Sequence, residues 1–176
     1  AVRRGRRGGR VDRDRPISAT AGALTNSRAG TFLGRSGTLH GIALASAMKC
    51  GAEAVETALK PAGKWAYTVK GVPADRAEII VCDGNFHGRT IAIVGFSSVP
   101  QYRDGFGPFP AGFKSVPFGD LAALQAAISP NTAAFLVEPN PREGGINAPT
   151  QGHLCGVART LRRHSGLVAS ERDPSG

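Results

Sequence analysis

The feature that most constrains the fold is a regular alternation of apolar runs and amphipathic stretches in the second half of the chain. The runs "AEIIVC" (77–82) and "TAAFLVEP" (132–139) are apolar at successive positions, as strands buried on both faces of a parallel sheet require. The segments 119–129 and 151–166 instead follow the helical period. Strands that alternate with helices predict an α/β fold with a parallel sheet.

Shorter stretches complete this pattern. Asp120 is placed to cap the helix that follows it, and "GAEAVETALK" (51–60) has the spacing of an amphipathic helix. Pro61 is expected to end or kink that helix, because proline has no amide hydrogen and clashes with the preceding turn. The run 41–48 suits a strand or a buried helix. The other expected elements are two short strands and one helix: 113–118, 167–170 and the segment "GRTIAIVGFSS".

The amino-terminal 40 residues differ from the rest of the chain. Residues 1–15 hold seven arginines and two aspartates, and they contribute +5 of the formal net charge of +9. This arm is broken by glycines and lacks aromatic residues, so we expect a disordered or atypical basic segment over 1–40. A solvated tail or a segment outside the folded unit is the preferred interpretation, and a nucleic-acid-binding arm and a processed transit peptide are the alternatives.

Length and composition narrow the class of protein. A chain of 176 residues can bury one hydrophobic core, and no window approaches the roughly 18 apolar residues of a membrane span. The three cysteines are an odd number without close spacing. They indicate reduced thiols and a cytoplasmic protein rather than a disulfide framework.

Polar segments follow the strands where a parallel sheet binds its ligands. "DGNFHGRT" comes directly after one strand, "EPNPREGG" comes after another, and "KCGAE" opens a helix whose free amides favour an anion. If these segments converge, Phe86 offers a stacking surface and Arg89 a partner for a carboxylate, beside the acidic Glu138 and Glu143. This combination suits a phosphorylated aromatic cofactor with an amino-acid substrate.

Several motifs resemble, in order and spacing, the ornithine aminotransferases, which are class III pyridoxal-phosphate enzymes of fold type I. They are "GAEAVETALK", "KWAYTVKG", "GNFHGRT", "YRDGFGPFPAGF", "PFGDLAALQAAI" and "AAFLVEP…EGGINAP". The resemblance covers about 100 residues between Lys49 and Pro149, with a fainter echo in "LTNSRA". It implies that residues 41–176 form part of the parallel-sheet large domain of such an enzyme, as an incomplete copy.

The resemblance also implies roles for individual residues. Cys50, Gly51 and Ala52 would lie at the cofactor phosphate, with Cys50 in place of a serine or threonine usual in the family. Phe86 would stack on the pyridine ring and Glu138 would lie close to it. The substrate would be bound by two further residues: Arg89, at its carboxylate, and Glu143. His87 needs no separate role, and a Cys82/His87 metal pair lacks companion ligands, so no metal is expected.

The chain departs from the family where the covalent chemistry is expected. Family members use a lysine that bonds to the cofactor and an aspartate on the pyridine nitrogen, both after the "VEP" segment. Here Ser170 stands at the aspartate position and Glu171 follows it. All five lysines lie upstream: Lys49, Lys60, Lys64, Lys70 and Lys114. We therefore expect no catalytic residue and no transaminase activity from this chain alone.

Two hypotheses on function follow. The first is a truncated ornithine aminotransferase, or one part of a split enzyme, which transfers the δ-amino group of ornithine to 2-oxoglutarate through pyridoxal phosphate. Its partners would be a second copy or a complementary fragment, with no membrane. The second is a non-enzymatic remnant or binding module, whose distinctive surface is the basic arm and whose partner would be nucleic acid; we consider this less favoured.

Overall fold

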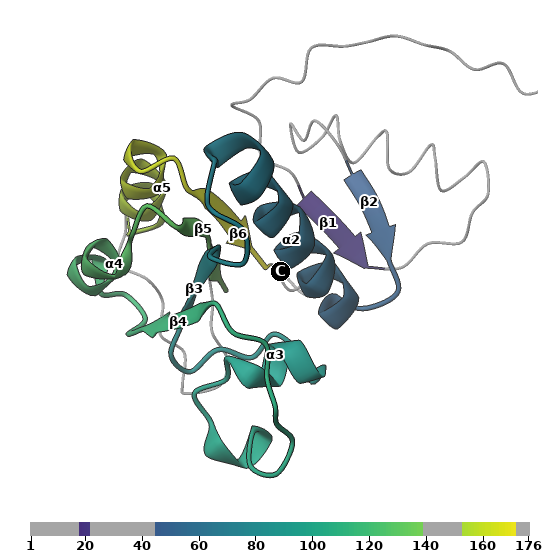
Figure 1. Ribbon diagram of the computed structural model, residues 1–176. Coiled ribbons are helices and arrows are strands. Elements are labelled where there is room, and N and C mark those ends of the chain that lie inside the picture. Colours follow the sequence, from purple (N-terminus) through teal and green to yellow (C-terminus); the bar gives the residue numbers. More distant parts are fainter. Residues whose placement is uncertain (1–17, 22–44, 139–152, 172–176) are drawn as a thin grey trace, which may run out of the picture. The chain divides into compact units, whose positions relative to one another are not determined.

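The computed structural model describes residues 18–21, 45–138 and 153–171 (Figure 1). The chain divides into two compact units, 1–50 and 51–176. In the first unit, strand β1 (Ser18–Ala21) pairs in parallel with strand β2 (Ala45–Met48). The sequence pattern left 41–48 open between strand and helix, and the strand is correct. Strand β1 was not expected.

The second unit contains a four-stranded sheet in the order β4-β3-β5-β6, and every neighbouring pair is parallel. The strands are β3 (Glu78–Cys82), β4 (Phe113–Val116), β5 (Thr132–Val137) and β6 (Leu167–Ser170). All six residues of β5 are buried, as expected for a strand covered on both faces. The predicted α/β fold with a parallel sheet is confirmed.

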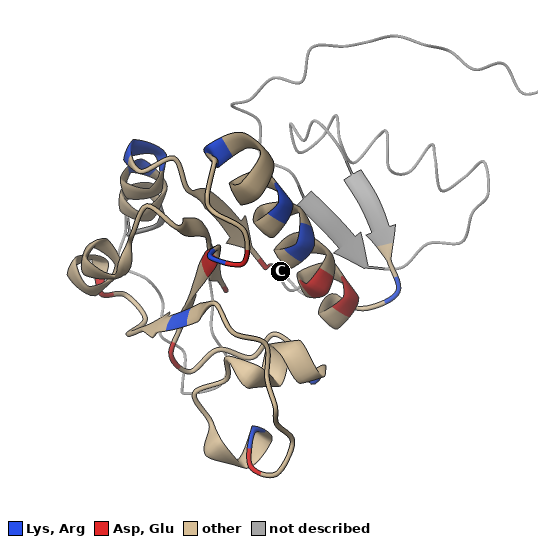
Figure 2. Cartoon of the chain, viewed as in Figure 1, with Lys and Arg blue, Asp and Glu red and all other residues tan. Residues whose placement is uncertain are grey.

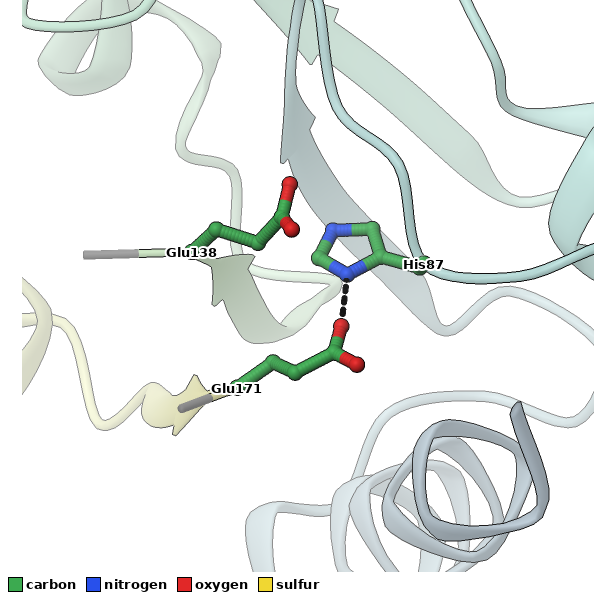
Figure 3. Close-up of side chains that lie close together, drawn as sticks. All are labelled: His87, Glu138 and Glu171. Carbon is green, nitrogen blue, oxygen red and sulfur yellow. Dashed lines mark hydrogen bonds and ion pairs between the residues drawn. The ribbon is translucent and has the colours of Figure 1, made fainter. Parts of the chain in front are cut away.

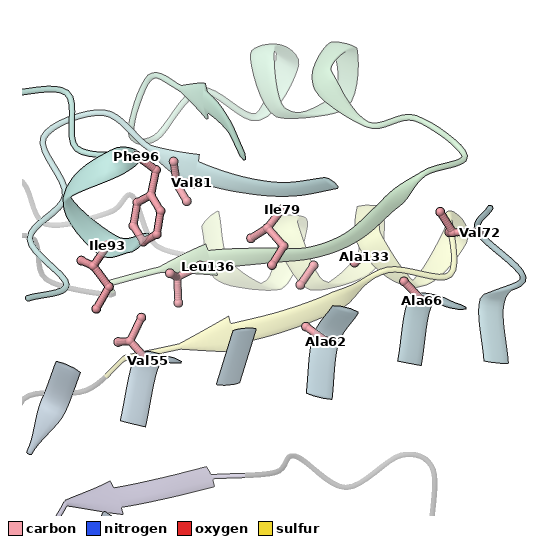
Figure 4. Packing of buried hydrophobic residues seen from close by; sticks show 11 residues of the cluster. Val55, Ala62, Ala66, Val72, Ile79, Val81, Ile93, Phe96, Ala133 and Leu136 are labelled. Carbon is pink, nitrogen blue, oxygen red and sulfur yellow. The ribbon is translucent and has the colours of Figure 1, made fainter. Parts of the chain in front are cut away.

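Helices cover both faces of this sheet (Figure 1). From Ile79 to Cys82 in β3 and from Ala134 to Val137 in β5, successive residues alternate between two apolar clusters. Figure 4 shows the cluster formed with α2 (Gly51–Trp65) and α3 (Ile91–Gly95). On the opposite face Phe135 and Ile80 pack with α4 (Leu121–Ala127) and α5 (His153–Arg163). Because both clusters draw on the same strands, the sheet is the centre of a three-layer core.

Pro61 was expected to end or kink helix α2, but the helix continues through this residue, so the expectation that it ends there was wrong. After Trp65 the chain forms a π-helical turn, Ala66–Lys70, which ends at Gly71 with a positive φ of 79°. An interior proline costs about 3 kcal/mol through its lost hydrogen bond and its clash. Val55, Ala62 and Ala66 are all buried against the sheet, and this packing offsets that cost.

Local capping sets two helix starts. Asp120 accepts a hydrogen bond from the amide of Ala123 at 2.8 Å, which confirms its predicted capping role. Thr90 caps α3 in the same way, by accepting from the amide of Ile93. A 3₁₀ turn, Pro100–Tyr102, follows α3. Of the described helices, none combines the length and apolarity needed to cross a bilayer.

Candidate functional site

The carboxyl ends of three parallel strands bring polar groups together. The loop 83–90 follows β3, Glu138 follows β5 and Glu171 follows β6. The backbone amide of Phe86 donates to Oε2 of Glu138 at 3.0 Å, and Nδ1 of His87 lies 2.5 Å from Oε2 of Glu171. The loop is therefore tied to two neighbouring strands at the edge where open α/β sheets bind ligands.

Hydrogen bonds hold the loop 83–90 in one conformation. The buried side chain of Asn85 donates to the carbonyl of Cys82 at 2.5 Å, which turns the chain back on the end of its own strand. The amide of Gly84 donates to Oγ of Ser98 at 2.7 Å. These contacts fix the direction in which the following aromatic residue leaves the sheet.

The same loop also lies against the first turns of α2. Gly88 has a φ of +124°, and a β-carbon at this position would lie only 2.7 Å from Cβ of Ala52. Glycine is required here both for its backbone conformation and for the close approach. Further along, Oγ1 of Thr90 donates to Oε1 of Glu56 at 2.5 Å. The helix start and the loop therefore form one wall of the site.

Phe86 and Arg89 form an aromatic platform with a cation beside it. The half-buried Phe86 ring meets Tyr102 edge-on, with 6.1 Å between ring centroids. The guanidinium carbon of the exposed Arg89 lies 5.7 Å from the centroid of Phe86. A planar ligand that stacks on this ring would have an arginine within reach of its anionic substituents.

Two carboxylates flank His87 (Figure 3). His87 is 2% exposed, and its Nε2 has no hydrogen-bond partner. Glu171 also approaches the start of α2, since a β-carbon at Gly51 would lie 3.3 Å from its Oε1. The sequence pattern assigned no role to His87 or Glu171. The signal that could have found Glu171 is its position directly after a parallel strand.

Cys82 is buried at the end of β3. Burial raises the pKa of the Cys82 thiol to about 12, and the negative charges of Asp83 and Glu138 add to the effect. A thiol must lose its proton to bind a metal well. The Cys82/His87 pair was not favoured on its spacing, and the surroundings of Cys82 give a second reason against it.

Two of the lysines are bonded to groups at the amino end of the sheet. Lys70 donates to the carbonyl of Thr132, at the start of β5, at 2.6 Å. Lys114 bonds to Glu78, at the start of β3, at 2.7 Å. Both lysines therefore bond at the amino end of the sheet, opposite the site. The other three are exposed, two on the later turns of α2 (Figure 2) and one in the first unit: Lys60, Lys64 and Lys49.

The residues predicted to bind cofactor and substrate fall into three groups. The first group belongs to the helix start and the loop 83–90 or contacts that loop: Gly51, Ala52, Phe86, Arg89 and Glu138. Cys50 is exposed and belongs to the first unit. Glu143 lies outside the described residues. Ser170, the last residue of β6, is exposed and directly precedes Glu171.

The chain is similar in sequence and fold to aminotransferases. A sequence model of the family "Aminotransferase class-III" matches residues 17–170. Ornithine aminotransferase from Brevibacillus brevis is 46% identical over 160 residues, which cover 91% of this chain and 40% of that protein. The enzyme of the same name from Bordetella pertussis is 57% identical over 126 residues, which cover 72% of this chain and 29% of that protein.

A solved structure agrees with these relatives. The ornithine aminotransferase of Toxoplasma gondii, crystallized with oxidized glutathione and with partial occupancy of PLP at its active site, superposes with a TM-score of 0.80. It is 37% identical, and the match covers 87% of this chain and 36% of that one.

These matches test the resemblance seen in the motifs. The similarity extends over residues 17–170, beyond the motifs between Lys49 and Pro149 that indicated it. The chain spans about 40% of the length of the Brevibacillus relative. It belongs to the class-III aminotransferases and is a homologue, over part of their length, of ornithine aminotransferase.

Proposed function

We propose that this chain forms the part of an ornithine aminotransferase large domain that binds pyridoxal phosphate and the substrate carboxylate. The observation that carries the proposal is the close contact between Gly88 and Ala52. This contact sets the aromatic loop directly beside the amino terminus of α2. An anion site and a stacking surface are thereby adjacent, as a phosphorylated aromatic ring requires.

The phosphate would bind at the start of α2. This helix has 15 residues and begins at Gly51, which is exposed. The first amides of a helix lack partners within the helix, and the helix dipole places partial positive charge there. Gly51 and Ala52 would donate these amides to the phosphate. The first residue has no side chain to shield them.

The ring would stack on Phe86, whose orientation is fixed by the bond from its amide to Glu138. Arg89 would then bind the carboxylate of the amino-acid substrate, because its planar fork suits two carboxylate oxygens. The amino group of ornithine would be transferred to 2-oxoglutarate. Pyridoxal phosphate supplies an electron-withdrawing ring for this chemistry. The described residues fit the phosphate and the ring on these grounds.

The covalent step needs residues from elsewhere. Lys70 and Lys114 are bonded at the opposite end of the sheet, and Ser170 carries no charge to offer a pyridine nitrogen. We infer that the reactive lysine comes from a segment outside this sequence or from a second chain. On this account the chain binds cofactor but performs no transamination alone.

Absorbance during titration with pyridoxal phosphate tests the proposal, followed by borohydride reduction and mass spectrometry. We expect saturable binding without a reducible adduct of unit stoichiometry. Absence of saturable binding would overturn the proposed cradle. A stoichiometric adduct on one of the five lysines would instead overturn the inference that the reactive lysine lies elsewhere.

Matched variants locate the binding. Phe86→Leu removes the stacking ring and should weaken binding by about 10-fold. Phe106→Leu, at an exposed phenylalanine outside the site, should leave binding unchanged. Arg89→Lys should weaken the binding of amino acids at the site. Arg103→Lys is the matched control and should leave this binding unchanged, because Arg103 stacks in the same way on another ring, that of Phe109, at 5.6 Å.

A further inference from the structure

Three side chains at the carboxyl end of the sheet form a cluster with ligand geometry. His87, Glu138 and Glu171 each offer one nitrogen or oxygen atom, and these atoms all lie within 4.8 Å of one another. Each residue comes from a different segment, one after each of three neighbouring strands. Figure 3 shows the imidazole ring lying between the two carboxylates. We refer to these residues as the His–Glu cluster.

A second observation points to a bound group at this position. Nε2 of His87 is the one buried side-chain nitrogen or oxygen without a hydrogen-bond partner in the part of the chain that the structure describes. The side chain of His87 is 0% exposed, so water does not compensate for the missing partner. Leaving a buried polar atom unsatisfied costs about 1–3 kcal/mol. A ligand on Nε2 would remove this cost.

The contact between His87 and Glu171 prepares the imidazole for such a ligand. When Nδ1 donates its proton to Oε2 of Glu171, the lone pair of the ring remains on Nε2. In the view of Figure 3 the carboxylate of Glu138 is drawn on the side of the ring that carries this second nitrogen. Histidines that bind metals are oriented in this way by a carboxylate on the other ring nitrogen.

The donor set selects the kind of ion. An imidazole nitrogen and a carboxylate oxygen are ligands that zinc accepts, at about 2.0–2.2 Å from the ion. Magnesium and calcium prefer oxygen ligands alone. Glu138 and Glu171 are half-buried, so an ion has a path from solvent. We propose that Nε2 of His87 and the carboxylate of Glu138 bind a divalent transition-metal ion of the zinc class, while Glu171 orients the imidazole through Nδ1.

This inference goes beyond the proposed function, because it requires neither pyridoxal phosphate nor a reactive lysine. Its test is calorimetric titration of the full chain with Zn²⁺ after treatment with a chelator. The exposed thiols Cys50 and Cys155 also bind zinc and would obscure the result. The titration is therefore made in the double variant Cys50→Ser/Cys155→Ser. We expect one site of defined stoichiometry.

Substitutions in the cluster assign that site. Glu138→Gln and Glu171→Gln keep the side-chain shape and should each weaken zinc binding by about 10-fold or more. His87→Asn should do the same, but His87 is buried, so the two glutamine variants decide if this one fails to fold. His164→Asn and Glu53→Gln, at exposed residues outside the cluster, serve as matched controls and should bind as before.

The outcomes separate cleanly. Loss of the site in the cluster variants alone supports the proposal. No zinc binding, equal binding in Glu138→Gln and Glu171→Gln, or equal loss in the controls would overturn it. Failure here would leave the proposed function untouched, because the cofactor titration is read in metal-free buffer.

Discussion

The two ends of the four-stranded sheet use similar residue types in opposite ways. At the amino end, Glu78 accepts from Lys114 at 2.7 Å and from Ser129 at 2.5 Å. At the carboxyl end, His87 lies against Glu171 and still has an unpartnered nitrogen. One end pairs its charges internally, whereas the other keeps a buried polar atom unsatisfied.

This difference indicates where the fold is stabilised and where it binds ligands. At the amino end, the charged and polar side chains bond to one another across neighbouring strands and turns. At the carboxyl end, His87 comes from a loop whose conformation depends on contacts of Asn85, Gly88 and Thr90. Ligand sites often keep strain and unsatisfied groups that stability alone would remove. Substitutions at the two ends should therefore change different properties.

The largest effect is expected for Phe135→Ala, which should disturb both ends together. Phe135 is 2% exposed in the central strand β5, where it packs between β3 and the helices α4 and α5. Removing its ring should lower the free energy of unfolding by about 3–5 kcal/mol. Urea unfolding followed by circular dichroism measures this loss.

The control for this prediction is another phenylalanine. Phe106 is 57% exposed, so Phe106→Ala should change the free energy of unfolding by less than about 0.5 kcal/mol. If the two variants unfold alike, the described core does not hold the sheet together.

Gly88→Ala should affect the carboxyl end of the sheet and leave the amino end unchanged. The new β-carbon would lie 2.7 Å from Cβ of Ala52, and a φ of +124° disfavours alanine. We expect a loss of about 2–3 kcal/mol in stability and weaker binding of pyridoxal phosphate. Urea unfolding and the cofactor titration measure the two effects.

Gly105→Ala is the matched control, because Gly105 also has a positive φ, of +81°, but a β-carbon there meets nothing within 4 Å. It should lose only the conformational part, about 1–2 kcal/mol, with cofactor binding unchanged. If Gly88→Ala leaves cofactor binding unchanged, the contact between Gly88 and Ala52 is not the basis of the site.

How far the sequence predicts each region depends on how local its determinants are. The cap at Asp120 and the fully apolar β5 were predictable, because each depends on neighbouring residues. Strand β1 was not, since its polar residues pair with a strand far along the chain. The expected end of the helix at Pro61 was wrong, because the burial of α2 outweighed the local preference of proline.

The candidate site shows the same division. Phe86 and Arg89, which are proposed to stack on the cofactor and to bind the carboxylate, lie within one short motif, so their roles could be proposed from their neighbours. The contact between His87 and Glu171 joins residues 84 apart in sequence, and no periodic pattern marks such a pair. It became visible only when the topology placed β6 beside β5.

Glu78→Gln should weaken the amino end alone. Burial by itself would raise the pKa of Glu78, but hydrogen bonds from Lys114 and Ser129 and the charge of Lys114 together lower it below its ordinary value of 4.5. A lowered folded pKa stabilises the protein above the unfolded pKa, and this contribution is lost as the pH falls through the folded value. Removing the carboxylate should cost about 1 kcal/mol at neutral pH.

Urea unfolding at neutral pH and at about pH 3 tests this sign. The difference between the original chain and Glu78→Gln should shrink at the lower pH, while pyridoxal phosphate binding at neutral pH stays the same. Lys114→Gln should show the same reduced dependence on acid. A constant difference between the two pH values would contradict the assigned role of the Glu78 carboxylate.

The smallest effect is a gain expected from Gly63→Ala in the last turns of α2. A β-carbon at this position meets nothing within 4 Å, and alanine is favoured over glycine inside a helix by about 0.5–1 kcal/mol. Thermal unfolding should shift upward, whereas binding at the helix start, near Gly51, should not change. Changed cofactor affinity would mean that the two ends of α2 are coupled, and the contrast between the ends of the sheet would not hold.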